Sequence, residues 1–303
     1  MCPGQGSQKV GMGKDLAERF PAARDTFAAI DEALGVPLSR LMWEGPEDEL
    51  VLTHNTQPAI LAHSAAVYAV VRERLGGVAA GAGHSLGEYS AYVAAGSLAA
   101  PDAARLVRRR GELMYEAGTR RPGAMSAVLG LDPAGVVAAC AEASGADGVA
   151  VAANLNAPDQ VVISGDPAAV VRAGDACKAR GAKRVLPLKV SGAFHSPLMA
   201  PAVAGLEAAL AAARFVDPAF PVVANASAEP VRTAPRAVRL LAEQLTAPVR
   251  WIECVQAASA LAPEATFIEL GPGGVLSGLL RKIVPGARSL TLGTAAEVEA
   301  FLA

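Results

Sequence analysis

Hydrophobic positions in the N-terminal third of the chain follow helical spacing, interrupted by one short apolar run. They predict helices over residues 25–34 and 58–75, and Pro58 suits the first turn of the second helix. Residues 77–83 are a strand candidate that is poor in β-branched side chains, and residues 86–93 return to helical spacing. This part of the chain therefore predicts an α/β arrangement.

A different rhythm begins near residue 123. Strand-like and helical segments follow in the order β-α-β-β-α-β, which is the ferredoxin-like split unit. Its length of about 70 residues suits a small lobe inserted into a larger α/β body. The predicted strands are 124–131, 148–153, 160–164 and 184–190, with helices at 132–144 and 166–180.

The body resumes near residue 191. Helices are predicted over 197–212 and 235–245, with strands at 221–223 and 266–270. We therefore divide the 303 residues into a large subdomain, 1–120 with 191–303, and a small subdomain, 121–190.

Composition narrows the functional classes. Hydrophobic residues make up 52% of the chain, which excludes a disordered protein, and the net charge of −2 argues against a nucleic-acid binder. No apolar run approaches the length of a membrane span. The four cysteines lie far apart and the four histidines lack metal-ligand spacing, so we expect reduced thiols, no metal and a cytoplasmic location.

Residues 83–88 (GHSLGE) carry the strongest chemical signal. A serine framed by glycines between a strand and a helix is typical of a nucleophile elbow, which exposes the hydroxyl of Ser85 at a helix N-terminus. There the helix dipole and free N–H groups favour a developing oxyanion. The alternative is an ordinary capping box formed by Ser85 and Glu88.

Arg110 tests the functional interpretation. On a helical wheel it projects within roughly 20° of the centre of the apolar stripe of its helix, whereas Arg109 and Arg108 point elsewhere. A buried guanidinium requires an anion to offset its desolvation. That anion is either an internal Asp or Glu or, in the functional interpretation, a substrate carboxylate held in bidentate fashion.

His195 is the candidate general base. It follows a predicted strand and precedes Ser196-Pro197, and catalytic groups favour such junctions. A structural histidine is the alternative. His84 adjoins Ser85 but points away from it on an elbow, so we interpret it as part of the scaffold. We interpret His54 and His63 as surface or core residues.

At these residues the chain resembles the malonyl-CoA:acyl carrier protein transacylases, the acyltransferases of bacterial fatty-acid and polyketide synthesis. The resemblance covers nearly the whole chain, and its ordered motifs are jointly specific. They are residues 3–8 (PGQGSQ), 56–59 (TQPA), 83–88 (GHSLGE), 110–111 (RG), 154–158 (NLNAP), 192–195 (GAFH) and 269–273 (ELGPG).

The resemblance implies a role for each matching residue. It implies that Ser85 attacks the thioester while His195 removes its proton, and that the backbone N–H groups of Gln5 and Leu86 form the oxyanion hole. Arg110 would bind the malonyl carboxylate. The remaining implied roles are pocket lining by Gln57, orientation of His195 by the main-chain carbonyl of Gln244, and malonyl preference through Phe194.

The resemblance also implies an α/β-hydrolase-like body with a parallel sheet, carrying the ferredoxin-like insertion. It implies malonyl-CoA as a substrate rather than a cofactor, no other cofactor, and a holo acyl carrier protein as acceptor. We expect a monomer, and the choice between fatty-acid and polyketide synthesis stays open. Members usually carry a short apolar strand before the PGQG turn, where this chain has Met1 and Cys2, so we expect a looser turn at Gln5 or an exposed sheet edge.

Two other functional classes are alternatives. An ester or acyl-carrier hydrolase needs Ser85 and His195 but has no use for an inward Arg110. A carrier-docking module with an inactive site needs none of the three side chains. Arg110 therefore discriminates among the hypotheses.

Overall fold

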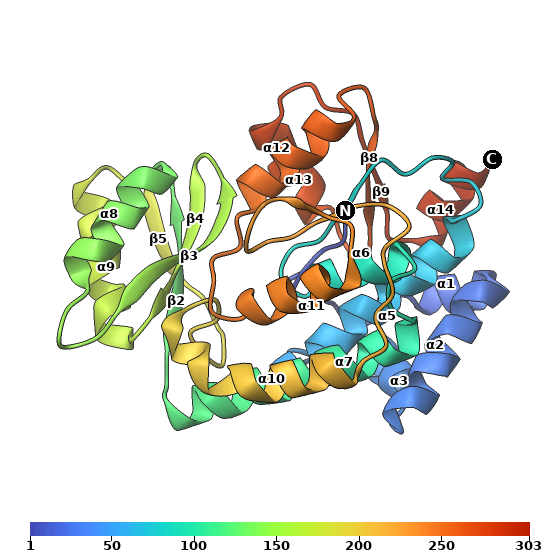
Figure 1. The fold of residues 1–303 in the computed structure, drawn as a ribbon, viewed down its shortest axis with the longest axis horizontal. Helices are drawn as coiled ribbons and strands as arrows, with labels where there is room; N and C mark the ends of the chain where they lie inside the picture. Colours follow the sequence, from blue (N-terminus) through green and yellow to red (C-terminus); the bar gives the residue numbers. More distant parts are fainter.

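A computed structural model describes residues 1–303 and places the chain in two units, a large body and a smaller unit beside it (Figure 1). The first part of the body is mainly helical and contains one short strand. Its elements are α1 (Lys14–Arg19), α2 (Pro21–Leu34), α3 (Leu38–Glu44), α4 (Glu47–Leu50), α5 (Thr53–Val71), β1 (Gly81–Ala82), α6 (Gly87–Ala94) and α7 (Ala100–Arg120).

The smaller unit follows in the predicted β-α-β-β-α-β order. Its four strands form one antiparallel sheet in the order β3-β4-β2-β5. The helices α8 and α9 pack together and against this sheet (Figure 1). The elements are β2 (Ala124–Leu129), α8 (Pro133–Ala143), β3 (Ala150–Ala157), β4 (Gln160–Gly165), α9 (Pro167–Ala179) and β5 (Arg184–Pro187).

Both faces of this sheet are covered. Val128 and Ile163 belong to a buried cluster with α8 and α9, while Met125, Ala153 and Val162 belong to the core of the body. Because neighbouring residues of a strand point to opposite faces, the unit joins the body through a continuous apolar face. Its orientation relative to the body is thus fixed by packing.

The chain then returns to the body. The two connecting segments pass closely, because a Cβ on Gly118 would lie 2.1 Å from the carbonyl oxygen of Ser191. The remaining elements are η1 (Pro197–Met199), α10 (Ala200–Ala212), β6 (Val222–Val223), β7 (Pro230–Val231), α11 (Ala234–Glu243), α12 (Trp251–Leu261), β8 (Phe267–Leu270), α13 (Val275–Ile283), β9 (Ser289–Leu292) and α14 (Ala295–Leu302).

Parallel pairing in the body is short. β1 pairs with β6 in parallel and β6 with β7 in antiparallel orientation, while β8 and β9 form a separate parallel pair. Met1 and Cys2 lie between the two groups: the N–H of Cys2 donates to Ala82 at 2.9 Å and the N–H of Leu270 donates to Met1 at 2.8 Å. These two residues thus tie the elbow strand to β8.

The predicted boundaries are wrong at α5. The helix begins at Thr53 rather than at Pro58, so the proline lies inside it. Proline has no N–H, and the carbonyl of His54 that would accept from it accepts instead from Arg108 Nη1 at 2.7 Å. A bond from the neighbouring helix therefore replaces the missing helical one.

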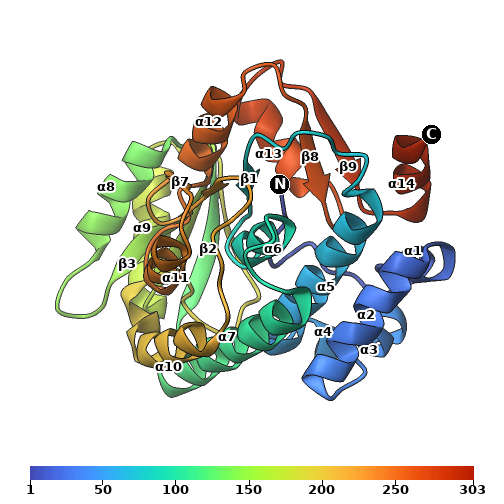
Figure 2. The same ribbon diagram turned by 45° about the vertical axis from the view of Figure 1, so that its right-hand side comes forward.

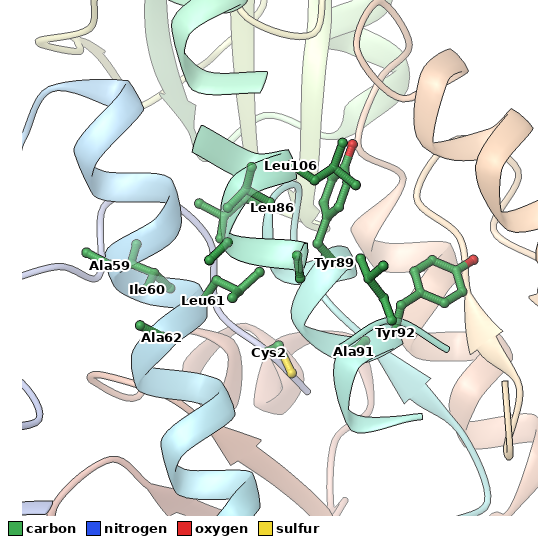
Figure 3. Close-up of a cluster of buried hydrophobic side chains, with 14 of the residues drawn as sticks. Cys2, Ala59, Ile60, Leu61, Ala62, Leu86, Tyr89, Ala91, Tyr92 and Leu106 are labelled. Atoms are coloured by element: carbon green, nitrogen blue, oxygen red, sulfur yellow. The ribbon is translucent and has the colours of Figure 1, made fainter. Parts of the chain in front are cut away.

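Helix α6 lies at the centre of the body, packed against α5, α7 and β1 (Figures 1 and 2). Residues 59–62 of α5 belong to the same buried cluster as Leu86, Tyr89 and Tyr92, and Figure 3 shows Leu86 on the side of α6 that faces α5. Helix α5 is buried on nearly all sides, and its N-terminal half buries polar side chains such as Asn55 and Gln57 as well as apolar ones. No helix has the length and apolar character that crossing a bilayer requires.

Candidate active site

Ser85 lies on a sharp turn between β1 and α6. Its φ of 52° is in the left-handed region, which a non-glycine residue adopts only when its surroundings enforce it. The turn is tight: a Cβ on Gly83 would lie 1.9 Å from the carbonyl of Gly87, and one on Gly87 would lie 2.2 Å from that of Cys2. The flanking glycines are therefore required by close backbone approach.

The capping-box alternative is wrong. No side-chain bond caps α6. The Oγ of Ser85 instead lies 2.7 Å from Nε2 of His195. The serine hydroxyl is thus directed across the site rather than to its own helix.

His195 is held in a defined orientation between β5 and η1. It also has a positive φ, of 54°, and its side chain is buried. Its Nδ1 donates to the main-chain carbonyl of Gln244 at 3.0 Å, which leaves Nε2 as the acceptor facing Ser85. Burial, with a contribution from Arg110, lowers the pKa of His195 to about 3, so the imidazole is neutral at pH 7.

Arg110 points inward, as the helical wheel predicts, and is 1% exposed. Its Nη1 donates to Gln57 Oε1 at 2.7 Å, while Nη2 donates to Gln244 Oε1 at 2.9 Å and to Ser85 Oγ at 3.2 Å. The guanidinium lies over the ring of Tyr89, 5.6 Å from its centroid. Burial lowers the pKa of Arg110 from its usual value.

None of these contacts is with a carboxylate. Arg110 forms no ion pair and its Nε has no hydrogen-bond partner, whereas the exposed Arg109 beside it pairs with Glu112 and Glu116. The structure thus excludes the internal salt bridge that the sequence left open. Arg108 is intermediate, since it is half-buried against α5 rather than pointing away.

Two backbone N–H groups beside Ser85 have no acceptor within the protein. They belong to Gln5 and Leu86. The 3–8 turn abuts the elbow, because a Cβ on Gly4 would lie 2.6 Å from the carbonyl of His84. The side chain of Gln5 donates to Thr53 Oγ1 at 3.3 Å. The turn is thus anchored on both sides, and the predicted loosening is not observed.

Gln57 and Phe194 are the remaining predicted residues, and both are buried. Gln57 is fully buried and donates to Met114 Sδ at 3.3 Å besides accepting from Arg110. Phe194, immediately before His195, is 6% exposed. The structure therefore joins Ser85, His195, Arg110, Gln57 and Gln244 in one hydrogen-bonded network.

Sequence reasoning missed three features of the site. Asn225 accepts from the N–H of Ser85 at 2.7 Å, and the side chain of Gln244, not only its carbonyl, contacts Arg110. Glu88 is fully buried and accepts from both Asn225 and Gln244. Only Glu88 stood in a recognised motif, and there it suggested a cap.

The other histidines lie apart from this chemistry. His84 Nε2 donates to Asn156 Oδ1 at 2.8 Å, and the ring packs edge-on against Trp251, which fits a scaffold role. His63 is fully buried with no partner for either ring nitrogen. No three His, Cys, Asp or Glu side chains gather in a group that could hold a metal ion.

The comparisons with known proteins now decide the family. The model of the acyl transferase domain matches residues 1–295. The chain is similar to the malonyl CoA-acyl carrier protein transacylase of Escherichia coli K12, with 48% identity covering 93% of this chain and 91% of that one. It shows 46% identity to that of Bacillus subtilis, covering 93% and 89%. The chain belongs to this transacylase family.

Solved structures agree with this assignment. The chain resembles an acyl carrier protein S-malonyltransferase from Vibrio cholerae, with TM-score 0.92, 44% identity and coverage of 98% of this chain and 97% of that one. It also resembles a malonyl-transacylase solved with a type II polyketide acyl-carrier protein, with TM-score 0.93, 44% identity and coverage of 99% and 97%. The resemblance seen in the motifs is confirmed.

Proposed function

We propose that this transacylase-family protein transfers a malonyl group from malonyl-CoA to the phosphopantetheine thiol of a holo acyl carrier protein. The reaction is ping-pong and passes through a malonyl-Ser85 intermediate. The names of the relatives support the overall reaction. The role of each residue is inferred from the geometry around Ser85.

The unpaired guanidinium of Arg110 carries the proposal. It is 1% exposed, has no carboxylate partner, and lies 3.2 Å from the Oγ of Ser85. A buried positive charge without a counter-ion is unfavourable until an anion binds it. A malonyl thioester offers a carboxylate to Arg110 at one end and an electrophilic carbonyl to Ser85 at the other.

The first half-reaction forms an ester and breaks a thioester. Ser85 Oγ attacks the thioester carbonyl while its proton passes to Nε2 of His195, and the N–H groups of Gln5 and Leu86 stabilise the oxyanion. The intermediate then expels coenzyme A, which leaves as the thiol with the proton from His195. In the second half, the carrier thiol gives its proton to His195 and attacks the ester, and Ser85 recovers a proton.

Substrate binding also assists the base. The charge of Arg110 contributes to the low pKa of His195. A bound carboxylate offsets that charge, so the imidazolium becomes less unfavourable when malonyl-CoA is present. Malonyl-CoA thus raises the basicity of the group that activates Ser85.

Phe194 gives the site a preference for malonyl over methylmalonyl groups. Its side chain is buried, and it immediately precedes the base in the chain, where bulk would crowd an α-methyl group. One methyl group is worth about 1–3 kcal/mol of discrimination, so the preference is partial. Equal kcat/KM values for the two thioesters would remove Phe194 from the specificity argument.

The architecture fits an α/β-hydrolase-like body, 1–120 with 191–303, carrying a ferredoxin-like subdomain at 121–190. The antiparallel order β3-β4-β2-β5 and the elbow between β1 and α6 support these assignments. We propose that the protein acts as a cytoplasmic monomer without a cofactor. A hydrolase has no use for the charge of Arg110, and no observation favours that alternative.

Mass spectrometry tests the intermediate. After the protein is mixed with malonyl-CoA, we expect a malonyl adduct that is absent in Ser85→Ala and that disappears when holo carrier is added. An adduct released to water at the rate of transfer would instead indicate a hydrolase, and no adduct at all would indicate a docking module.

Arg110→Ala tests the carboxylate clamp. We expect malonyl transfer to fall by about a hundredfold or more, because one charge-assisted bidentate contact is lost, while acetyl transfer is retained or raised. Arg109→Ala is the control, since Arg109 is exposed and pairs with Glu112. Unchanged malonyl transfer in Arg110→Ala would refute the proposal.

Assays with fatty-acid and polyketide carriers then identify the pathway.

A further inference from the structure

Glu88 is a buried carboxylate that the reaction just described does not use. It lies in the first turn of α6, is fully buried and forms no direct ion pair. Burial raises the pKa of Glu88 to about 7. Burial of a carboxylate is unfavourable unless hydrogen bonds or ion pairs offset the loss of hydration.

Both side-chain hydrogen bonds of Glu88 are accepted by one carboxylate oxygen. Oε2 accepts from Gln244 Nε2 at 2.7 Å and from the N–H of Asn225 at 2.9 Å, while Oε1 has no partner. Both contacts lead to residues that touch the reacting groups. Glu88 is therefore linked to Ser85, His195 and Arg110 through one intervening residue, Gln244 or Asn225.

Gln244 connects Glu88 to the clamp and to the base. Its Oε1 accepts from Arg110 Nη2 at 2.9 Å and its main-chain carbonyl accepts from His195 at 3.0 Å. An amide has a donor end and an acceptor end that differ little in shape. Only hydrogen-bond partners decide which end faces the guanidinium.

The guanidinium has only donors, so it requires the oxygen end of Gln244. Two acceptors hold the NH2 end: Oε2 of Glu88 at 2.7 Å and the main-chain carbonyl of Ser85 at 3.0 Å. The reversed amide would direct N–H groups at the guanidinium and leave Glu88 facing an oxygen. The second end of the network fixes the elbow, because Asn225 donates to the carbonyl of Gly83 at 2.8 Å and accepts from Ser85 at 2.7 Å.

We propose that Glu88 is a positioning residue for acyl transfer. Its carboxylate, together with the Ser85 carbonyl, holds the NH2 end of Gln244 and so keeps Arg110 and His195 in the arrangement that receives the malonyl group. The proposal rests on the proposed malonyl transfer. It assigns Glu88 no contact with substrate.

Two substitutions at Glu88 separate hydrogen bonding from volume. Glu88→Gln keeps an oxygen that can accept from Gln244, whereas Glu88→Met keeps the length but removes every acceptor. We expect malonyl kcat/KM to fall by about a hundredfold in Glu88→Met, the size of effect that a small misplacement of reacting groups produces. Acetyl transfer, which does not need Arg110, should fall less, and Glu88→Gln should restore most of the malonyl activity.

Glu269→Met is the matched control. Glu269 is also a fully buried carboxylate, but it accepts from the N–H groups of Leu276 and Ser277 at the start of α13, away from the site. We expect it to lower the melting temperature while leaving the malonyl-to-acetyl ratio of the folded protein unchanged.

A double-mutant cycle with Gln244→Met decides the mechanism. If Glu88 acts through Gln244, the double variant loses no more malonyl kcat/KM than Gln244→Met alone. Fully multiplicative losses, or a wild-type malonyl-to-acetyl ratio in Glu88→Met, would overturn the proposal. Failure of the wild type to form a malonyl adduct would instead refute the function and not the role of Glu88.

Discussion

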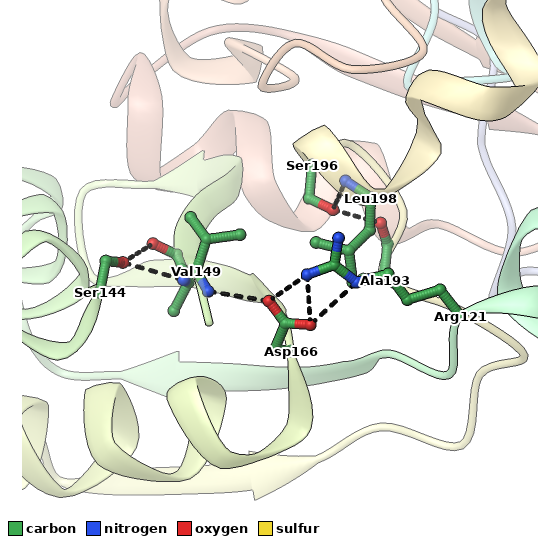
Figure 4. Close-up of polar contacts among 8 residues, drawn as sticks. Arg121, Ser144, Val149, Asp166, Ala193, Ser196 and Leu198 are labelled. Carbon is green, nitrogen blue, oxygen red and sulfur yellow. Dashed lines mark hydrogen bonds and ion pairs between the residues drawn. The ribbon is translucent and has the colours of Figure 1, made fainter. Parts of the chain in front are cut away.

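The smaller unit and the active site of the body treat charge in opposite ways. In the smaller unit, Asp166 accepts from Arg121 Nη2 at 2.8 Å and from the N–H of Val149 at 2.8 Å, in a partly exposed cluster (Figure 4). In the body, Arg110 and Glu88 are both buried and neither has a direct ionic partner. Charges that pair at the surface stabilise a fold modestly, whereas unpaired buried charges stand ready for a ligand.

The units also differ in how their cores are built. Every member of the buried cluster under α8 and α9 lies between Val128 and Cys177, whereas the core of the body includes residues from Cys2 to Val298. The smaller unit is therefore assembled from local contacts. The body depends on contacts between distant parts of the chain.

The largest difference should appear when a methyl group is added to a glycine in each unit. Gly83→Ala places a Cβ 1.9 Å from the backbone of Gly87, while Gly145→Ala in the smaller unit meets nothing within 4 Å. We expect Gly83→Ala to destabilise by at least about 3 kcal/mol and to abolish transfer. Gly145→Ala should change the denaturation midpoint little. Similar midpoints for both variants would contradict the comparison.

The pH profile of acetyl transfer should show how Arg110 acts on its neighbour. His195 must be neutral to accept a proton, so activity is lost as pH falls through its pKa, which burial and Arg110 lower to about 3. Arg110→Met removes the charge, and we expect the acidic limb of kcat/KM to move to higher pH by about one to three units. Arg109→Met serves as control. An unmoved limb would show that burial alone sets the pKa.

Acid sensitivity should originate in the body. Burial lowers the pKa of His63 to about 4, so protons bind the unfolded chain preferentially and stability falls as pH drops from 6.5 to 4. His63→Leu removes this titration. Between pH 7.5 and pH 4 the variant should therefore lose less unfolding free energy than the wild type, by up to about 3 kcal/mol. Urea denaturation at both values measures it. Parallel losses in wild type and variant would place the sensitivity elsewhere.

The smallest effect is expected for the surface pair. Asp166→Ala removes the bonds to Arg121 and Val149, and should lower the free energy of unfolding by about 1 kcal/mol without altering malonyl transfer. Hydrogen bonding to Val149, with help from Arg121, lowers the pKa of Asp166, so this contribution is lost as pH falls below its usual pKa. A loss of transfer would link the smaller unit to the site more tightly than the contacts indicate.

The sequence determined most of what is local. All six elements of the smaller unit match their predicted segments within a few residues, because each buries one face at a regular period. The same periodicity identified Arg110 as the inward member of three arginines. The ordered motifs indicated the family and brought Ser85, His195 and Gln244 into consideration together.

Features that depend on residues far apart in the chain could be seen only in the three-dimensional structure. Pro58 was misplaced because the donor that replaces its missing N–H, Arg108, comes from another helix. Asn225 gave no signal and Glu88 only that of a helix cap, since their roles arise from contacts with residues that the fold brings together from as far as 156 positions away in the chain. Periodicity reports which face of an element is buried, but not which polar groups it contacts there. Those contacts are what leave Arg110 without a direct carboxylate partner.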